Sequence, residues 1–324
     1  MVPEKDREAR GTPLVVASID IGTNTVLLLV ATIDPGGIIH THEYEQRVPR
    51  LGKGVDADRN LQPDSMARVS AVLGEYRSLL QRYSPERIIV AGTSAVRDAR
   101  NKGQFLDLIR REAGFEVEVL SGADEALWTY RGAISGVPGL AQATVLDIGG
   151  GSTEITAGDR EQIKESCSLD IGSVRLTERF FIHDPPHASE IASASRWVAE
   201  ALSRPGGFNF RGTTLIGVAG TATSLAILDQ GLREFSIRAI MNYVLTVDRV
   251  EALLDKLRTM SSSEILRLSA VLKGRNDIIL AGTLILREVM AHHGFNSMIV
   301  SERGVRYGLA IREWVRSQQP GATA

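Results

Sequence analysis

Two stretches of the chain carry the same pattern: Ala17-Ser18-Ile19-Asp20-Ile21-Gly22-Thr23-Asn24-Thr25 and Val145-Leu146-Asp147-Ile148-Gly149-Gly150-Gly151-Ser152-Thr153-Glu154. In each, apolar residues lead into Asp-Ile-Gly and then into small polar residues, and a second apolar segment follows. This pattern predicts a β-hairpin whose tip offers backbone N–H groups, hydroxyls and one carboxylate. Glycine tolerates the close approach that phosphate requires, and consecutive N–H groups in such a turn bind anions. Two copies indicate a duplicated unit, with two phosphate-binding hairpins facing each other across a cleft.

The composition is that of an ordinary globular protein. The 324 residues are 43% hydrophobic and 23% charged, with a net charge of −2 at pH 7. This length favours two domains, and the near-neutral charge provides no field that would attract nucleic acid or an anionic membrane. We therefore expect no DNA or membrane partner. Any polyanionic ligand must be held by locally clustered Lys and Arg.

Cysteine content and the N-terminal segment indicate the compartment. The single cysteine, Cys167, cannot form an internal disulfide, which suits a reducing environment. The sequence has no apolar run of membrane-spanning length, and its first residues are charged rather than signal-like. We expect a cytoplasmic protein with residues 1–11 as a flexible arm.

The order of predicted strands and helices repeats. Strand-like segments at 14–20, 26–33 and 38–45 precede helix–strand units, and a second set of three strands begins after Gly136-Val137-Pro138-Gly139. Asn101 and Ser121 are predicted helix caps. This repetition predicts an α/β chain of two domains, each with a mixed sheet of about five strands. We expect domain I over 12–130 plus 304–324 and domain II over 131–303.

Six short motifs occur in an order typical of one known family: 20–25 (DIGTNT), 92–97 (GTSAVR), 121–126 (SGADEA), 147–154 (DIGGGSTE), 220–223 (GTAT) and 301–306 (SERGVR). The chain resembles the exopolyphosphatase / guanosine pentaphosphate phosphatase family over nearly its whole length. That family is a branch of the actin / sugar kinase / heat-shock chaperone superfamily, so the resemblance implies two actin-like (ribonuclease H-like) domains flanking an interdomain cleft. It also implies that water, with a divalent metal such as Mg²⁺ or Mn²⁺, cleaves the terminal phosphate from inorganic polyphosphate or guanosine pentaphosphate.

The hairpin tips and the 220–223 segment are the expected phosphate-binding elements. A single Gly-rich turn is more often only a tight turn, but the pairing and a third segment that opens a helix favour an anion site. The residues concerned are Gly22, Thr23, Asn24, Thr25, Gly149, Gly150, Gly151, Ser152, Thr153, Gly220 and Thr221.

Two residues are candidates for the chemical step. Hydrolysis of a phosphoanhydride needs a positioned water, a base and compensating positive charge. The resemblance places the general base at Glu125, although the adjacent Asp124 remains an alternative because spacing cannot decide which carboxylate faces the cleft. Arg97 matches the family motif, and its guanidinium suits a transferring phosphoryl group.

Three acidic residues are candidate metal ligands. Asp147 ends one predicted strand and Glu154 begins the next, and in the light of the family resemblance both look like Mg²⁺ ligands, directly or through water. Asp20 holds the equivalent place on the first hairpin. For Asp20, metal binding and a turn-stabilising contact are equally supported.

The remaining basic residues and histidines are less informative. Seven basic residues could line a track for a polyphosphate chain, but a solvated surface position is equally open for each: Arg47, Arg50, Lys53, Lys273, Arg275, Arg303 and Arg306. The histidines His183, His187, His292 and His293 show no ligand spacing supported by an acidic or Cys partner, so we interpret them as structural.

The leading functional hypothesis is a metal-dependent hydrolase that releases terminal phosphate from inorganic polyphosphate. Guanosine pentaphosphate is the alternative substrate, but Val26-Leu27-Leu28-Leu29 after the first tip offers a nucleotide no basic side chain. A kinase of the same superfamily and a non-catalytic polyphosphate or alarmone sensor are further alternatives. Glu125 beside Arg97 favours hydrolysis, and three carboxylates in a polyanion site disfavour a sensor unless a metal is bound. As for the oligomeric state, the sequence leaves a homodimer open.

Overall fold

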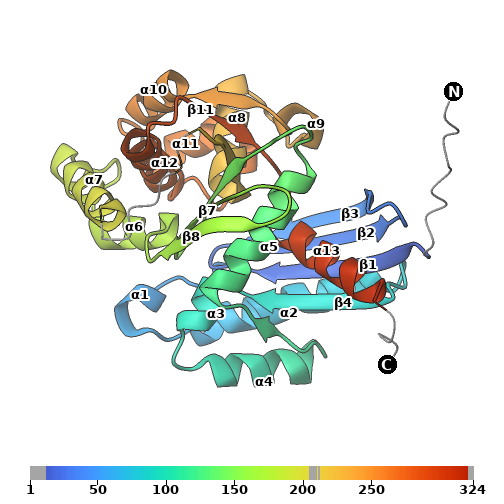
Figure 1. The fold of residues 1–324 in the computed structure, drawn as a ribbon. Helices are drawn as coiled ribbons and strands as arrows, with labels where there is room; N and C mark the ends of the chain where they lie inside the picture. Colours follow the sequence, from blue (N-terminus) through green and yellow to red (C-terminus); the bar gives the residue numbers. More distant parts are fainter. Residues whose placement is uncertain (1–11, 204–209, 211, 320–324) are drawn as a thin grey trace, which may run out of the picture.

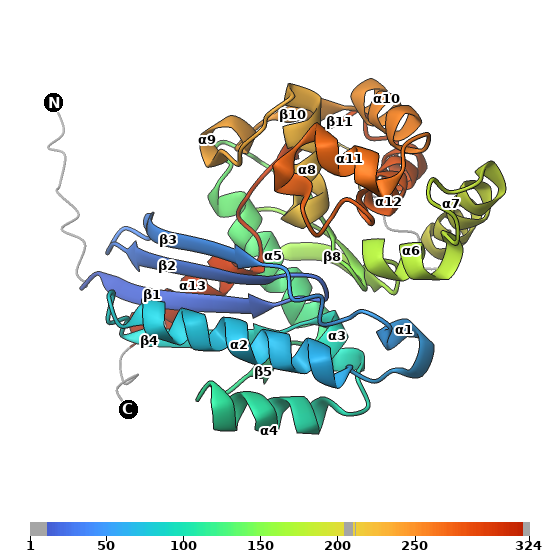
Figure 2. The same cartoon turned by 180° about the vertical axis from the view of Figure 1, so that it is seen from behind.

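The fold consists of two mixed β-sheets with helices on both faces of each (Figures 1 and 2). The computed structural model describes residues 12–203, 210 and 212–319, so the expected arm at 1–11 lies outside the described residues. The two sheets match the two repeats found in the sequence. The domain boundaries near 130 and 303 stay predictions.

The first sheet has the strand order β3-β2-β1-β4-β5. Strands β1 (Leu14–Ile21), β2 (Val26–Ile33) and β3 (Ile39–Arg47) form an antiparallel meander, as predicted. Strands β4 (Arg87–Gly92) and β5 (Glu118–Val119) continue the sheet parallel to β1.

The second sheet repeats this topology with one extra strand, in the order β10-β11-β9-β6-β7-β8. Here β6, β7 and β8 form the meander, and β9 and β11 run parallel to β6. The strands are β6 (Ala143–Ile148), β7 (Thr153–Gly158), β8 (Ile163–Leu169), β9 (Thr214–Val218), β10 (Val244–Thr246) and β11 (Ser297–Val300).

Helices connect and cover these strands. Those of the first half are α1 (Val55–Asp58), α2 (Pro63–Leu80), α3 (Ser94–Asp98), α4 (Lys102–Glu112) and α5 (Gly122–Ser135). Those of the second half are α6 (Ser173–Phe180), α7 (Ala188–Leu202), α8 (Ala219–Gln230), α9 (Ile237–Ile240), α10 (Val247–Leu257), α11 (Ser262–Leu268), the 3₁₀ turn η1 (Ala270–Leu272), α12 (Ile279–His293) and α13 (Val305–Ser317). Within the part of the chain that the structure describes, none of these helices is long and apolar enough to cross a membrane.

Alternating side chains of the central strands build a core on each face of each sheet. In β1, Ile19 packs into the cluster formed with α2 and α4, whereas Val16 packs against α13. In β6, Leu146 belongs to the cluster of α8, α10 and α12, and Val145 packs against α5. Strands buried on both faces need apolar residues at consecutive positions, which explains the continuous apolar runs before each Asp-Ile-Gly.

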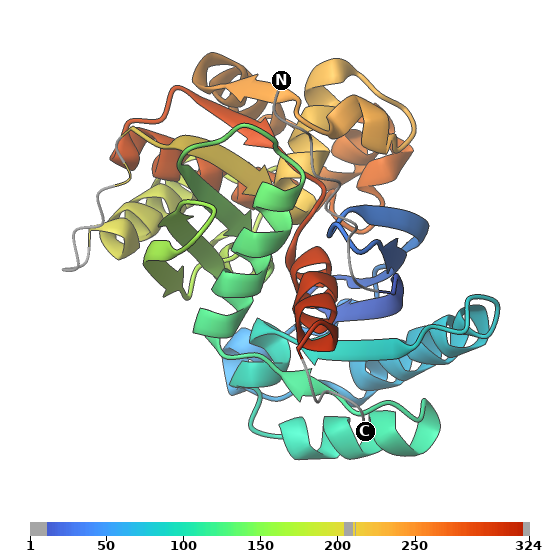
Figure 3. The same cartoon turned by 45° about the vertical axis from the view of Figure 1, so that its right-hand side comes forward.

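Helices α5 and α13 join the two halves. They lie side by side (Figure 3, green and red), with α13 against β1 and β2 and α5 against the meander of the second sheet. A Cβ atom at Gly308 would lie 1.7 Å from the carbonyl oxygen of Trp128, so the close contact between these helices requires glycine there. This packing fixes α5, and with it Glu125, between the two sheets.

Of the two predicted helix caps, the structure confirms one. Ser121 caps α5 through a hydrogen bond from the N–H of Asp124, as predicted. Asn101 precedes α4 but does not cap it, because its amide bonds both backbone groups of Leu61 instead. Strand β5 is only two residues long.

Candidate active site

The two hairpin tips meet in one cavity. The first tip (residues 22–25) joins β1 to β2, and the second tip (residues 149–152) joins β6 to β7. Together with the first turn of α8 they line a cavity of about 100 Å³. The predicted site residues in its wall are Asp20, Gly22, Thr23, Asn24, Thr25, Glu125, Asp147, Gly149, Gly150, Ser152, Gly220 and Thr221. Arg97, Gly151, Thr153 and Glu154 do not line it.

Both tips have the same backbone construction. The N–H of Gly22 donates to the carbonyl of Thr25 over 2.9 Å, and the N–H of Gly149 donates to Ser152 over 3.0 Å. Among the described residues, the N–H groups of the next two positions in each tip, 23–24 and 150–151, find no acceptor. Such groups are available to an anion.

Three predicted polar side chains are held by the protein itself. The Thr23 hydroxyl lies 2.9 Å from that of Ser94, and the Asn24 amide donates to the carbonyl of Gly274 over 3.1 Å. The Thr153 hydroxyl donates to a backbone carbonyl before α6 over 2.6 Å. These side chains help to fix the tips in place, and the backbone N–H groups of the tips stay available as donors for a ligand.

The third predicted phosphate-binding segment opens a helix, as the sequence indicated, and lies within its first turn. Gly220 and Thr221 lie in the first turn of α8, after Ala219, whose φ of 60° turns the chain from β9 into the helix. The helix N-terminus thus lines the cavity, where its free N–H groups favour an anion. Gly220 also makes room for Arg275, because a Cβ atom there would lie 2.7 Å from the Arg275 guanidinium carbon.

Carboxylates gather in and next to the cavity: Asp20, Asp147 and Glu125 line it, and Glu154 is the neighbour of Asp147. Asp147 and Glu154 are directly opposite each other in the β6–β7 ladder, so their side chains project from the same face of the sheet. The Glu154 carboxylate is buried and accepts a hydrogen bond from Ser168 over 2.7 Å. Oδ1 of Asp20 is buried and accepts no hydrogen bond from the described residues, and none of these residues donates a hydrogen bond to the Asp147 carboxylate either.

This crowding raises the pKa of each of these acids. Burial raises the pKa of Asp20 to about 8, with further contributions from the charges of Glu125 and Asp147. Burial and Glu125 raise the pKa of Asp147 to about 7. The pKa of Glu154 is well above its ordinary value for the same reasons, although the Ser168 hydrogen bond opposes the shift. Oxygen ligands of this kind are those of a hard divalent cation, which would offset their mutual repulsion.

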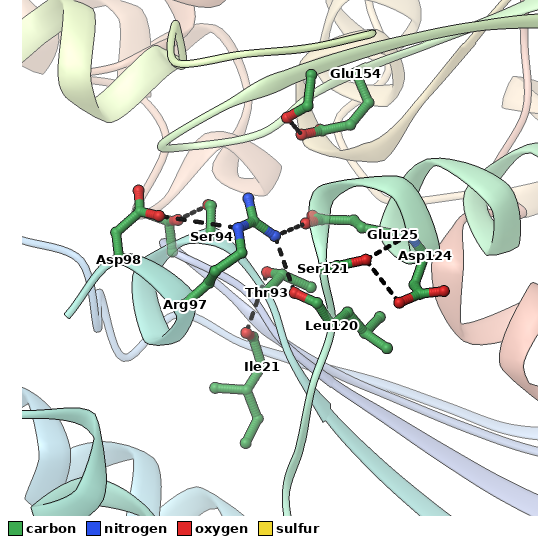
Figure 4. Close-up of polar contacts among 12 residues, drawn as sticks. Ile21, Thr93, Ser94, Arg97, Asp98, Leu120, Ser121, Asp124, Glu125 and Glu154 are labelled. Carbon is green, nitrogen blue, oxygen red and sulfur yellow. Dashed lines mark hydrogen bonds and ion pairs between the residues drawn. The ribbon is translucent and has the colours of Figure 1, made fainter. Parts of the chain in front are cut away.

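Arg97 and Glu125 form an ion pair beside this acidic cluster (Figure 4). Nη1 of Arg97 donates to Oε2 of Glu125 over 2.6 Å and to the carbonyl of Leu120 over 3.2 Å. Burial raises the pKa of Glu125, and the hydrogen bond from Arg97 opposes that shift. Asp124 is exposed and accepts a hydrogen bond from Ser121 over 2.6 Å. Of the two adjacent carboxylates, only Glu125 lines the cavity.

Two residues that the sequence did not single out connect Arg97 to the second tip. Asp98 lies 3.8 Å from Nε of Arg97, and it accepts a hydrogen bond from Nη2 of Arg175 over 3.2 Å. Nε of Arg175 in turn donates to the carbonyl of Gly151 over 2.9 Å. Asp98 and Arg175 come from distant segments, and neither carries a sequence signal of the contact.

Of the seven basic residues considered above, Arg275 alone lines this cavity. Its buried guanidinium donates to Gln46 over 3.1 Å and forms no ion pair within the described residues. The other arginines of the set contact protein groups: Arg47 binds Glu45, Arg50 binds Asp277, Arg303 binds Ser135 and Arg306 binds Glu302. Lys53 and Lys273 are exposed, and Lys53 lines a neighbouring cavity.

The chain is similar to known proteins over most of its length. The model of the Ppx/GppA phosphatase family matches residues 29–317. Exopolyphosphatase 2 of Mycobacterium tuberculosis is 36% identical over 314 residues, which cover 91% of this chain and 97% of that protein.

Solved structures give the same result. An exopolyphosphatase from Cytophaga hutchinsonii superimposes with a TM-score of 0.85 at 30% identity, covering 92% of this chain and 97% of that one. The Ppx/GppA family member of Aquifex aeolicus gives a TM-score of 0.80 at 30% identity, covering 95% of this chain and 99% of that one. The chain therefore belongs to the Ppx/GppA phosphatase family.

Proposed function

We propose that this protein is an exopolyphosphatase, a hydrolase that removes terminal orthophosphate from inorganic polyphosphate. One observation carries the proposal: two tips, whose N–H groups at 23–24 and 150–151 find no acceptor among the described residues, enclose a cavity that is also lined by Glu125, Asp20 and Asp147. A polyanion and a cluster of acids are compatible in one site only when cations lie between them. The similarity to exopolyphosphatases of other organisms supports the same activity.

Phosphate binding is assigned to the two tips, the N-terminus of α8 and Arg275. The tips contribute backbone N–H groups from both sides of the cavity, and α8 contributes the positive end of its dipole. Arg275 adds a buried positive charge that no carboxylate neutralises among the described residues. None of these contacts requires a sugar or a base.

Asp147, Glu154 and Asp20 are the residues that would hold Mg²⁺ or Mn²⁺. Their carboxylates fit such an ion for three reasons. Asp20 and Glu154 are buried and Asp147 lies opposite Glu154 in the ladder, all three have raised pKa values, and the carboxylates of Asp20 and Asp147 accept no hydrogen bond from the described residues. When bound, the ion supplies positive charge against the phosphate oxygens.

Glu125 is assigned as the general base and Arg97 as the group that stabilises the transferring phosphoryl. Oε2 of Glu125 is held by Arg97, whereas Oε1 has no partner within the described part of the chain. Oε1 is thus free to take a proton from water as the water oxygen attacks the terminal phosphorus. The bridging P–O bond breaks, and the shortened chain leaves with that electron pair. Guanidinium donors of Arg97 stabilise the charge on the transferred group.

Guanosine pentaphosphate is the second candidate substrate. Leu27, Ile278 and Ile279 also line the cavity, so one part of its wall is apolar and could contact the face of a purine. A base is not needed for the phosphate contacts described above, and polyphosphate remains the substrate we favour.

The test is phosphate release from long polyphosphate, short polyphosphate and guanosine pentaphosphate, measured side by side with Mg²⁺ and with chelator. We expect Mg²⁺-dependent release from polyphosphate at the highest kcat/KM and without any acceptor molecule. A preference for guanosine pentaphosphate would establish the second candidate. Transfer of phosphate only to an added acceptor would indicate a kinase, and binding without turnover would indicate a sensor.

A further inference from the structure

A second group of potential metal ligands lies outside the cavity. His183 is in the connection between α6 and α7, His187 immediately precedes α7, and Glu190 lies in the first turn of α7. One ligand atom from each of the three lies within 4.8 Å of the other two. Helices α6 and α7 form one edge of the molecule, away from α5 and α13 (Figures 1 and 2). The sequence led us to treat these histidines as structural because no acidic partner was evident, and the structure provides one in Glu190.

Existing contacts already hold the three side chains together. Nδ1 of His183 lies 2.9 Å from Oε1 of Glu190, and the two imidazole rings stack with their centroids 3.7 Å apart. The same carboxylate accepts hydrogen bonds from the backbone N–H groups of Ile182, over 3.2 Å, and His187, over 2.8 Å. Glu190 is thereby fixed in position, which reduces the entropy that a ligand would otherwise have to overcome.

The connection that carries His183 is also anchored at its middle. The Asp184 carboxylate accepts hydrogen bonds from the N–H and the hydroxyl of Ser262, both over 2.7 Å, at the start of α11. His183 itself keeps a side chain that is 53% exposed, so its ring can rotate and reach an ion from solvent. The site thus combines a fixed carboxylate with an adjustable imidazole.

We propose that His183, His187 and Glu190 bind a transition-metal dication of the Zn²⁺ type at the surface of this protein. Two imidazoles and one carboxylate are ligands that suit Zn²⁺, Ni²⁺, Co²⁺ and Cu²⁺. Zn–N and Zn–O bonds of about 2.0–2.2 Å need ligand atoms roughly 3.5 Å apart, so a rotation of the exposed His183 ring is the adjustment that closes the site. Water completes the coordination. Magnesium prefers an all-oxygen environment, and this distinguishes the site from the acidic cluster in the cavity.

The test is Zn²⁺ binding to the untagged full-length protein in excess Mg²⁺, measured by calorimetry and by the Zn²⁺-induced rise in melting temperature. We expect one Zn²⁺ per chain for the wild-type protein and for Asp147→Asn. His183→Ala, which leaves α7 and its first turn intact, should weaken binding by at least about tenfold and abolish the thermal shift. Glu190→Gln should also weaken it, while Mg²⁺-supported hydrolysis by His183→Ala should be unchanged.

His292→Ala is the matched control, because His292 also adjoins a second histidine but belongs to no three-residue ligand group within the described residues. It should bind Zn²⁺ as the wild type does. The proposal is overturned if the wild type binds no Zn²⁺, if His183→Ala binds it equally well, or if Asp147→Asn removes the binding. These outcomes do not depend on whether polyphosphate is the substrate.

Discussion

The two hairpins of this protein have the same backbone construction but carry different numbers of carboxylates. Each has a four-residue tip closed by the same backbone hydrogen bond, 2.9 Å in the first and 3.0 Å in the second. Asp20 and Asp147 occupy equivalent places near the ends of β1 and β6. The residue opposite Asp20 is Leu27, whereas the residue opposite Asp147 is Glu154. The second hairpin therefore presents two carboxylates on one face of its sheet where the first presents one.

The tips also differ in how they are held. The Thr23 and Asn24 side chains of the first tip are tied to Ser94 and to the carbonyl of Gly274. Both tips are also held through their backbone carbonyls: those of Thr23 and Asn24 accept from the N–H groups of Gly52 and Arg50, and those of Gly149 and Gly151 accept from Ser173 and Arg175. We propose that the duplicated unit keeps one backbone design for phosphate, and that the residue opposite the Asp, Leu27 or Glu154, sets whether a hairpin can bind metal.

The largest effect is expected when the proposed base is removed while both hairpins remain intact. Glu125→Gln keeps the shape of the side chain but cannot accept a proton, so turnover should fall by about 10²–10⁴-fold with little change in polyphosphate affinity. Asp124→Asn is the matched control, because Asp124 is exposed and bonds Ser121. Steady-state kinetics with a separate binding measurement would check this. A dead Asp124→Asn beside an active Glu125→Gln would show that the base is the neighbouring residue.

The same substitution at equivalent positions of the two hairpins should have unequal effects. Asp147→Asn removes one of the paired carboxylates and should lower Mg²⁺-supported turnover by about 100-fold or more, with a higher Mg²⁺ requirement. Asp20→Asn should cost less than about tenfold, because Asp20 has Leu27 rather than an acid as its cross-strand partner. Turnover measured across a Mg²⁺ titration distinguishes the two. Full activity of Asp147→Asn would contradict its assignment.

Glycines that support the two tips offer a test of how rigidly each is held. A Cβ atom at Gly172 would lie 2.4 Å from the backbone of Gly150, whereas one at Gly52 would meet a methyl group of Thr23 at 2.2 Å. A side chain can rotate and backbone cannot, so Gly172→Ala should destabilise the protein by about 1–3 kcal/mol and Gly52→Ala by less. Chemical denaturation would measure both. Equal losses of unfolding free energy in the two variants would mean that the tips are equally rigid.

The smallest effect on activity is expected when the Asp98–Arg175 ion pair, which links the two halves beside Arg97, is removed. Asp98→Asn removes a partly exposed ion pair with Arg175, which at about 0.2–1 kcal/mol predicts a change in kcat/KM of less than about fivefold. The difference from wild type should shrink at high salt, because exposed ion pairs are screened. Asp107→Asn, in the exposed pair with Arg110 on α4, should show no change in kcat/KM. A loss as large as that of Glu125→Gln would assign Asp98 a direct part in the chemistry.

Much of this fold could be predicted from the sequence because its signals are local. The repeated Asp-Ile-Gly and the apolar runs before it indicated both meanders, and Ser121 marked the start of α5. What the sequence could not provide depends on contacts between distant segments. Asn101 is a residue type that often caps helices, but its side-chain amide bonds the backbone N–H and carbonyl of Leu61, 40 residues away, instead.

In the candidate site, too, local motifs could be predicted from the sequence and contacts between distant segments could not. The family motifs placed Glu125, Arg97 and Asp147 in regions that the structure brings together, but adjacent positions 124 and 125 could not be separated before the orientation of α5 was known. Asp98, Arg175 and the carbonyl of Gly151 form a chain of contacts with no periodicity or motif behind it. Thr23, Asn24 and Thr153 were interpreted as phosphate donors because their type allows it, whereas their side chains bond protein groups. Their roles, like those of the other site residues, stay predictions until tested.

Direct Mn²⁺ binding, followed by electron paramagnetic resonance, tests the central claim that the second hairpin holds the metal. Glu154→Leu gives the second hairpin the Asp–Leu pair of the first, and Asp20→Asn alters the first hairpin alone. We predict that Glu154→Leu weakens Mn²⁺ binding by at least about tenfold, that Glu154→Gln does so to a similar extent, and that Asp20→Asn stays within a few-fold of the wild type. Unfolding curves would verify that the variants remain folded. Undiminished Mn²⁺ binding by both Glu154 variants, or a greater loss in Asp20→Asn, would contradict the account.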